Sequence, residues 1–370
     1  MARAPIASIK RRWKQMSEAA EAGHKSIAAQ LADHARLRLV GSKINMDEYH
    51  TLALYNRELH LDNDVTRYGG RDLKNEIHAQ LNNIRWEGMM TDKFIQYSLL
   101  KHFAVPHPTV QALVSPHMRR TTGDIPVLMN APDIADFLTD TARYPFFCKA
   151  VKGSFGSGAM RVDAIDTDSN TLTLADGSKQ SVEQLCDAML QCQQFGLLIQ
   201  DAAQPEPSLV PTIGNVLSGL RMIVLVGDDG PQHFRTSWKV PVGGNIIDNY
   251  DSGRTGNLVA DIDVTNGTVN RVVGGYAVDA TVNPPHPDTG VTLAGMQLPG
   301  WDALSDTVMR AAMCFPGFRW QHWDVGITAT GPTIFELNSA GAVAPAQVAA
   351  GRGVMDEQLT QFLDKYRHTR

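Results

Sequence analysis

The chain contains 370 residues, a length that corresponds to two or three domains of about 100–200 residues each. Hydrophobic residues make up 43% and charged residues 20% of the chain, and these ordinary globular proportions exclude disordered and fibrous classes. Lys and Arg number 34 against 39 Asp and Glu, which gives a formal net charge of −5. This balance excludes the chain-wide basic field of nucleic-acid-binding proteins, so we expect no nucleic-acid partner.

The longest apolar runs, such as residues 222–226, are strand-sized, so the sequence predicts no integral membrane segment. The first residues, MARAPIASIKRRWKQ, are basic but lack the apolar stretch of a secretory signal. They favour either peripheral contact with an anionic membrane surface or a solvated helix face. The four cysteines show no C-x-x-C spacing, which is typical of reduced thiols in a cytoplasmic protein.

Taken in chain order, the first elements are helical. Apolar residues recur at three- and four-residue steps over residues 8–40, with Gly23 as a weak point, and a second helix is expected over 46–61. Residues 62–71 contain Asn, Asp and a Gly-Gly pair, which are typical of a loop. We therefore expect a helical N-terminal region over residues 1–85 that serves as a packing element or a partner surface.

Helices and strands alternate after Thr91, which indicates a mixed α/β or α+β body. Thr91 is a candidate N-cap and Pro132 suits the first turn of a helix. The expected elements are a helix over 92–103, a strand over 109–115, a helix over 133–143, and strands over 145–152 and 159–165.

A glycine cluster lies between the last two strands. Its spacing is G-x-x-G-x-G, which is not the dinucleotide fingerprint, and no Lys-Ser/Thr pair follows it, so it is not a Walker A loop. A hairpin tip of this composition can close over phosphates with its bare N–H groups, although an ordinary flexible hairpin has the same composition. The cluster consists of Gly153, Ser154, Phe155, Gly156, Ser157 and Gly158.

Lysines precede this cluster. Lys149 lies within an apolar strand, and Lys152 follows three residues later. Burying a lysine costs free energy unless an anion meets the ammonium group, which favours a phosphate partner. The alternative is an edge-strand lysine that reaches water.

The C-terminal third contains two apolar strands that flank a Thr-Gly-Pro turn, which predicts a hairpin. Glu336 and Asn338 are two residues apart and therefore share a strand face, and antiparallel pairing brings Asp324 close to opposite Glu336. Two carboxylates and one amide oxygen suit Mg²⁺ with phosphates completing its shell. A solvated hairpin face is the alternative interpretation.

Three further polar residues are candidates. Arg221 begins an apolar strand and could hold a phosphate or a carboxylate with two hydrogen bonds. Lys239 and Asn249 flank the glycine pair 243–244, where surface hairpin turns would explain them equally well.

Together these features resemble the ATP-grasp superfamily over residues 86–350. The resemblance rests on the helix that opens with Lys93 and stops before Val-Pro-His-Pro, the lysine strand with its glycine hairpin, the arginine strand and the closing D…E-x-N hairpin. Within that superfamily, the chain resembles the sugar-transfer-associated branch in particular. This resemblance rests on Asp248-Asn249-Tyr, His286-Pro-Asp-Thr-Gly and a late Gln347.

The resemblance implies an α+β fold in which two lobes with antiparallel sheets hold ATP between them. Residues 86–203 would form the pre-ATP-grasp segment and the small lobe, and residues 204–370 the large lobe with the metal and substrate site. The nucleotide would contact Lys93, Lys149, Lys152, the glycine cluster, Gln200, Asp201 and Ala202. Arg221, Lys239 and Asn249 would be catalytic, and Asp324, Glu336 and Asn338 would hold two Mg²⁺ ions, for which Mn²⁺ could substitute.

The implied reaction is an ATP-dependent carboxylate–amine ligation through an acylphosphate, on small-molecule or sugar-linked substrates in polysaccharide or natural-product biosynthesis. A kinase of the same fold and a non-catalytic ATP-binding regulator are the alternatives. Two departures from the family pattern stand out. Gln200-Asp201 replaces a hinge glutamate, and residues 252–256 are bulkier than the family's glycine pair, which concerns the acceptor pocket.

Overall fold

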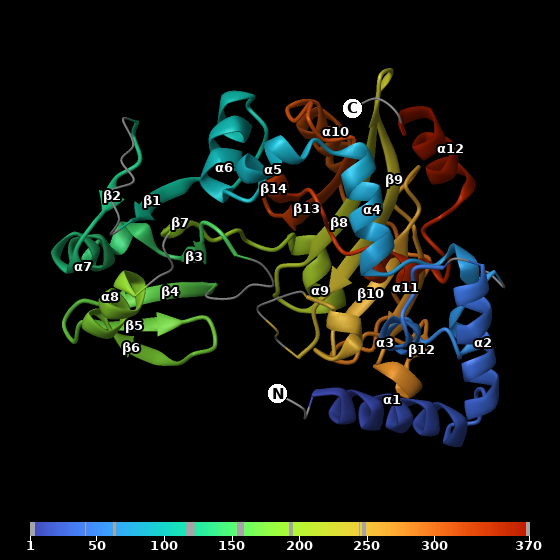
Figure 1. Cartoon of the computed structure of the whole chain (residues 1–370). Coiled ribbons are helices and arrows are strands. Elements are labelled where there is room, and N and C mark those ends of the chain that lie inside the picture. The colour runs from blue at the N-terminus through green and yellow to red at the C-terminus, as the bar shows by residue number, and fades with distance from the viewer. Residues whose placement is uncertain are drawn as a thin grey trace.

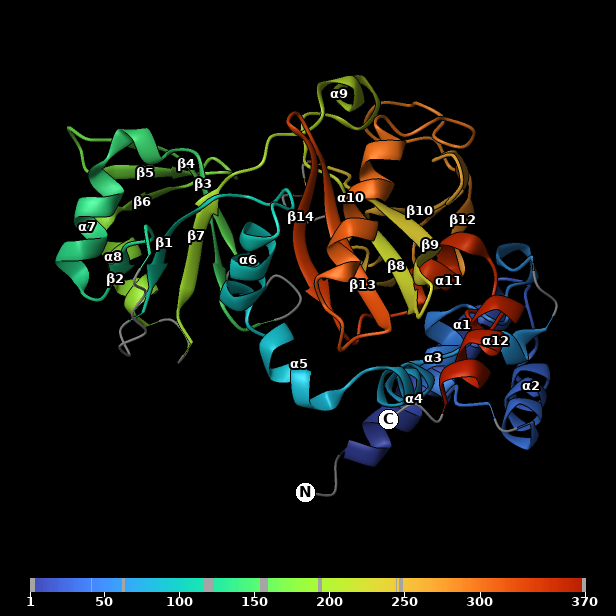
Figure 2. The ribbon, with the colours of Figure 1, turned by 90° about the horizontal axis from the view of Figure 1, so that it is seen from above.

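The computed structural model describes residues 4–40, 42–61, 64–115, 123–153, 159–191, 195–243, 245 and 249–367, without the side chains of residues 4–8. Within these residues the protein is a mixed α+β structure with two seven-stranded sheets in separate lobes (Figures 1 and 2). The predicted α+β class is therefore confirmed. Residues Ser154, Phe155, Gly156, Ser157 and Gly158 of the predicted glycine hairpin lie outside the described residues.

The first sheet has the strand order β2-β1-β7-β3-β4-β5-β6 and is antiparallel except for the β1–β2 pair. Its strands are β1 (Val110–Val114), β2 (Val127–Leu128), β3 (Phe146–Ala150), β4 (Met160–Asp166), β5 (Thr171–Leu174), β6 (Lys179–Ser181) and β7 (Leu197–Asp201). Helices α7 (Ala131–Thr139) and α8 (Val182–Leu190) bury their apolar faces in one core cluster with this sheet. Such burial of apolar surface is what stabilises the lobe.

The second sheet has the order β12-β11-β10-β9-β8-β13-β14. Its strands are β8 (Gly219–Gly227), β9 (Gly230–Val240), β10 (Leu258–Ile262), β11 (Val269–Gly274), β12 (Thr281–Val282), β13 (Trp320–Thr328) and β14 (Gly331–Asn338). Helix α10 (Trp301–Met313) packs on the face that carries Trp323. The opposite face, which carries Trp320, is covered by α4, α11 (Ala344–Ala350), α12 (Glu357–Tyr366) and the N-terminal region.

The N-terminal half begins with six helices, α1 (Ala4–Glu21), α2 (Ile27–Leu39), α3 (Met46–Thr51), α4 (Arg71–Leu81), α5 (Ile84–Met90) and α6 (Lys93–His102). The expected helix over 8–40 is wrong over residues 22–26. Helix α1 ends before Gly23, the expected weak point, which has a φ of 80°, and α2 begins at Ile27. The expected helix over 46–61 is wrong beyond Thr51. Ala53 adopts a left-handed φ of 49°, which ends the helix and starts a series of turns.

Short helical turns complete the described elements: η1 (Arg57–Leu59), η2 (Val65–Arg67), η3 (Thr141–Arg143), η4 (Pro207–Leu209), α9 (Val210–Ile213), η5 (Asp251–Gly253) and η6 (Ala277–Asp279). None of the helices in the described part of the chain combines the length and the apolar character that crossing a bilayer requires.

The start of α6 differs from expectation. Thr91 ends α5, and Asp92 caps α6 by accepting hydrogen bonds from the backbone N–H groups of Phe94 and Ile95. A carboxylate at this position also stabilises the positive end of the helix dipole, which explains why Asp92 replaces Thr91 as the cap. Lys93 therefore becomes the first residue of the helix.

Buried side-chain amides attach the segment between the N-terminal helices and the first sheet to the second sheet. Asn82 donates to the carbonyls of Trp320 and Ser339 at 2.8 and 2.9 Å and accepts from the Trp320 N–H at 2.9 Å. Gln96 pairs in the same way with both backbone groups of Leu337, at 2.9 and 2.8 Å. Because β14 is an edge strand, Gln96 satisfies backbone groups that no neighbouring strand can pair.

Candidate nucleotide and metal site

The site begins at the β13–β14 hairpin, where a β-bulge sets the register. Thr328 pairs with Gly331 at the turn, and a regular hairpin would continue until Asp324 faced Phe335. The register instead shifts between Asp324 and Val325, so Asp324 pairs with Glu336 and Phe335 is the extra residue. The expected juxtaposition of Asp324 and Glu336 is thus confirmed, and a bulge produces it.

Arg221 extends this row of side chains onto β8, where it is the cross-strand partner of Asp324. Its guanidinium donates to both oxygens of Asp324 at 2.7 Å each, and the Lys239 ammonium lies 3.6 Å from Asp324 Oδ1. Burial by itself would raise the pKa of Asp324, but Arg221 and Lys239 together hold that pKa well below its usual value. Asp324 is therefore ionised and holds the side chains of Arg221 and Lys239.

Asn338 joins the two carboxylates. Its side-chain amide donates to Asp324 Oδ2 and to Glu336 Oε1, both at 3.1 Å. The second Glu336 oxygen lies 3.3 Å from the Lys93 ammonium, which comes from α6. The structure therefore brings Asp324, Glu336 and Asn338 together, and their role as metal ligands stays a prediction.

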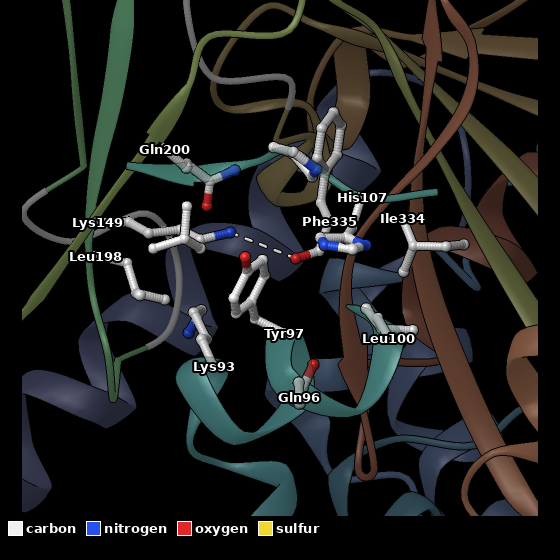
Figure 3. A pocket seen from close by; sticks show the side chains of 12 residues that line it. Lys93, Gln96, Tyr97, Leu100, His107, Lys149, Leu198, Gln200, Ile334 and Phe335 are labelled. Carbon is white, nitrogen blue, oxygen red and sulfur yellow. Dashed lines mark hydrogen bonds between the residues drawn. The ribbon is translucent and has the colours of Figure 1, made fainter. Parts of the chain in front are cut away.

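Lys93 and Lys149 bring positive charge from the first lobe. Lys93 also donates to the Gly153 carbonyl at 2.8 Å, so it connects the residue that precedes the glycine loop with Glu336 of the second sheet. Lys149 donates to the carbonyl of Phe335, the bulged residue, at 3.3 Å (Figure 3). Burial lowers the pKa of Lys149 to about 8, and the charge of Glu336 opposes that shift.

A pocket of about 300 Å³ opens beside Lys149. The side chains around it come from both lobes, and Figure 3 shows Lys93, Tyr97, Lys149 and Gln200 directed toward a common space. His107 closes one side with its ring edge-to-face against Tyr97, at 4.9 Å between centroids. The sequence analysis did not select Tyr97 or His107, because helix periodicity and the Pro-His-Pro helix stop gave each an ordinary structural explanation.

Other predicted residues lie apart from this cluster. The Lys152 ammonium is 4.0 Å from the centroid of the Phe195 ring. Asp201 is exposed and accepts a hydrogen bond from Gln111 at 2.7 Å, while the Ala202 N–H donates to the Pro145 carbonyl at 3.3 Å.

Asn249 lies in a loop, half-buried, and the contacts that position it run through its backbone. Its carbonyl accepts hydrogen bonds from Thr255 Oγ1 at 2.8 Å and from the side-chain amide of the fully buried Asn257 at 2.9 Å. The catalytic assignments of Arg221, Lys239 and Asn249 stay predictions.

Within the described residues, cationic side chains gather around the two carboxylates of the site. Four cationic groups, from Lys93, Lys149, Arg221 and Lys239, surround the two carboxylates of Asp324 and Glu336. Within the described residues, no group of three or more His, Cys, Asp or Glu side chains could hold a metal by itself. A polyanion that carries its own divalent cation fits both facts, because Mg²⁺ is commonly held by one or two carboxylates together with substrate phosphates.

Comparison with known families agrees with this geometry. A family model described as sugar-transfer associated ATP-grasp matches residues 72–363. The chain belongs to the sugar-transfer associated ATP-grasp family. In this ATP-grasp protein, the family match includes both sheets and the site, and it begins after α1, α2 and α3.

Solved structures give distant likenesses to this ATP-grasp protein. The L-amino acid ligase from Bacillus licheniformis matches with a TM-score of 0.38 and 11% identity, over 75% of this chain and 48% of that protein. The D-alanine–D-alanine ligase from Bacillus anthracis has a TM-score of 0.42 and 10% identity, over 80% of this chain and 74% of that protein.

A third structure is the N5-carboxyaminoimidazole synthase from Aspergillus clavatus in complex with ADP and 5-aminoimidazole ribonucleotide, with a TM-score of 0.39 and 12% identity, over 74% of this chain and 51% of that enzyme. The chain therefore spans about half the length of the L-amino acid ligase and of the synthase. No curated protein matches the chain at the threshold applied.

Proposed function

We propose that this protein is an ATP-dependent ligase that joins a carboxylate to an amine through an acylphosphate, in polysaccharide or natural-product biosynthesis. The observation that carries the proposal is the convergence of Lys93, Arg221 and Lys239 on the carboxylates of Asp324 and Glu336 where the two lobes meet. Positioned cations of this kind stabilise the charge that moves with a phosphoryl group during transfer. The substrates would be small-molecule or sugar-linked carboxylates and amines.

Residues of the two lobes would have different roles in the reaction. Lys93 and Lys149, on residues 86–203, would bind the nucleotide phosphates, with the adenine near Gln200 in the adjacent pocket. Arg221 and Lys239, on residues 204–370, would face the γ-phosphate and the carboxylate that attacks it. The attack forms the carboxyl-oxygen-to-phosphorus bond and releases ADP; the amine then forms the C–N bond and releases phosphate.

Asp324, Glu336 and Asn338 fit two Mg²⁺ ions by their chemistry, because two carboxylates and an amide lie together on the β13–β14 hairpin. Mn²⁺ could take the same places. When bound, these ions would neutralise charge on the phosphates. Rotation of the Asn338 amide, which now donates to both carboxylates, would present its oxygen to a cation.

A trapping experiment tests the reaction class. The protein is incubated with Mg-ATP, hydroxylamine and a panel of small and sugar-linked carboxylates, and acyl hydroxamates are measured by mass spectrometry. Hydroxamate formed only with ATP and one carboxylate class supports the acylphosphate. Phosphate transferred to a sugar hydroxyl without hydroxamate would replace the ligase by a kinase, and ATP binding without turnover on the whole panel would favour a regulatory protein.

A further inference from the structure

The first helices differ in charge from the rest of the protein. Residues 1–45 contain nine Lys or Arg and three Asp or Glu, a net charge of +6. Since the whole chain carries −5, the remaining residues carry −11. A protein that is acidic overall therefore has one strongly basic end, and such an asymmetry is typical of contact with an anionic surface.

Helix α1 leaves part of its apolar face uncovered. At its C-terminal half, Met16 and Ala19 are buried against the N-terminal core, 6% and 0% exposed. One turn and two turns earlier, Trp13 and Ile9 are 57% and 64% exposed. In both views the N-terminal end of α1 lies at the lower edge of the molecule, away from the first sheet and from α10 (Figures 1 and 2).

Basic side chains accompany this apolar row. Residues four apart lie one above the other on a helix, so Ile9 and Trp13 form one row and Lys10 and Lys14 form the adjacent row. Lys10 is exposed, and the Lys14 side chain is 76% exposed with Glu18 at 3.6 Å. An exposed indole beside lysines is the pattern of a helix that lies in a membrane interface.

Arg11 and Arg12 orient the helix. Both guanidinium groups contact Asp47 of α3, at 3.1 Å to Oδ2, and Arg12 also donates to Oδ1 at 3.2 Å. These contacts hold the polar side of α1 against the protein, so the Ile9–Trp13 row cannot turn inward without breaking them. Asp47 neutralises only part of the arginine charge, and the exposed lysine row, in which Lys14 has Glu18 at 3.6 Å, can meet an anionic partner.

We infer that α1 docks this protein onto an anionic lipid surface, with Trp13 and Ile9 inserted at the level of the headgroups and Lys10 and Lys14 paired with lipid phosphates. Lipid is favoured over nucleic acid because the exposed row is apolar. It is favoured over a second protein copy because residues 1–45 carry a net charge of +6, so two copies would bring like charge together. The inference does not depend on the ligase reaction, and its test needs no substrate.

Vesicle sedimentation of the full chain tests the inference. We expect binding to phosphatidylcholine vesicles that contain 30% phosphatidylglycerol, little binding to pure phosphatidylcholine, and loss of binding as salt is raised. Lys10→Glu/Lys14→Glu should weaken binding at least about 20-fold, since each surface lysine contributes about fivefold. Ile9→Ser/Trp13→Ser should weaken it to a similar extent.

Matched controls are Lys179→Glu/Lys365→Glu, which changes two exposed lysines elsewhere, and Leu39→Ser, which removes a side chain that is 88% exposed on α2. Both should bind vesicles as the wild type does. Circular dichroism and ATP affinity should be unchanged in every variant. These controls show that weaker vesicle binding results from the changed surface of α1 and not from misfolding. Brominated lipids should quench part of the tryptophan emission in the wild type, and Trp13→Phe should remove that quenching while vesicle binding persists.

Equal binding to neutral and anionic vesicles, or binding that survives both α1 variants, would overturn the inference. A wild-type dimer in light scattering that becomes monomeric in Ile9→Ser/Trp13→Ser would assign the row to a second copy instead. Binding to DNA but not to vesicles would assign the basic end to nucleic acid.

Discussion

Single residues at the lobe boundary carry the proposed chemistry, and Glu336 is the most informative of them. One of its oxygens faces Asn338 and the other faces Lys93, so it is the carboxylate that contacts both lobes. With Mn²⁺ as a paramagnetic probe and a non-hydrolysable ATP analogue, we expect two bound ions per chain and at most one in Glu336→Gln. Electron paramagnetic resonance measures this without turnover. Glu183→Gln, at an exposed position on α8, is the control and should bind two ions; two bound ions in Glu336→Gln would remove this residue from the metal site.

Lys149 and Arg221 should separate binding from catalysis. Lys149 lies half-buried beside the pocket, so Lys149→Met should raise the Kd for ATP about 10- to 100-fold, the loss of one charge-assisted hydrogen bond. Arg221 holds Asp324 and would meet charge that develops on the γ-phosphate, so Arg221→Ala should lower kcat about 10²–10³-fold with little change in Kd. Calorimetry and single-turnover rates measure the two effects, with Lys179→Met as the control. Loss of ATP affinity alone in Arg221→Ala would show that this residue does not act on the reacting phosphate.

At the scale of elements, buried side-chain amides form the hydrogen bonds of backbone groups that have no neighbouring strand or helix to pair with. Gln347 on α11 accepts from the N–H groups of Gly69 and Val354 at 2.9 and 3.0 Å and donates to the Gly69 carbonyl at 2.8 Å. It thereby joins the segment before α4 to the C-terminal segment. The residue that the sequence analysis connected with the sugar-transfer-associated branch is, in this structure, held by backbone contacts within the fold.

Asn82 allows a direct test of this arrangement. Asn82→Leu keeps the side-chain size but leaves the N–H and the carbonyl of Trp320 buried without their partner, while the Ser339 carbonyl keeps the ring of His78 at 3.0 Å. We expect the free energy of unfolding to fall by about 3 kcal/mol, since each unsatisfied buried group costs about 1–3 kcal/mol. Urea denaturation measures the change. Gln361→Leu, at an exposed position of α12, should change stability by less than about 0.5 kcal/mol, and an equal loss in both variants would contradict a specific role for Asn82.

At the scale of the whole molecule, buried histidines predict acid sensitivity. Burial lowers the pKa of His50, His60 and His233 to about 4 in each case, against about 6.5 in an unfolded chain. The unfolded state therefore binds more protons below pH 6.5, so stability is complete above that pH and falls as the pH drops toward 4. At pH 5 the loss should reach up to about 2 kcal/mol for each histidine.

Urea denaturation at pH 8, 6.5 and 5 measures this dependence. His233→Gln should reduce the loss between pH 6.5 and 5 by about 1.5 kcal/mol, the contribution of this one ring. His102→Gln, at an exposed position, should leave it unchanged. A free energy of unfolding that stayed constant from pH 8 to 5 would show that these rings are already charged, or solvated, in the folded protein.

The sequence by itself was sufficient for the strands of the hairpin and for a mixed α/β or α+β body, and it placed Asp324 close to opposite Glu336. These features depend on local periodicity and turn residues, which act over a few positions. The sequence also indicated the lysine strand, because an ionised side chain among apolar neighbours is visible without coordinates. The end of α3 at Thr51 and the cap at Asp92 were not predicted correctly, since boundaries depend on single backbone conformations and on competing polar side chains.

Only the tertiary structure decided how the two lobes share the site. The bulge at Phe335 turns its carbonyl to Lys149, and the Lys93 contact with Glu336 joins residues more than two hundred positions apart. The tertiary structure also decided that Trp13 is exposed while Met16 is buried. The apolar spacing of α1 places both on one face of the helix, but only the Met16 end of that face packs against the protein. Local sequence patterns specify which side chains share a face of an element. Long-range packing decides which element or solvent each face contacts. This packing determined the site between the lobes and the exposed surface of α1.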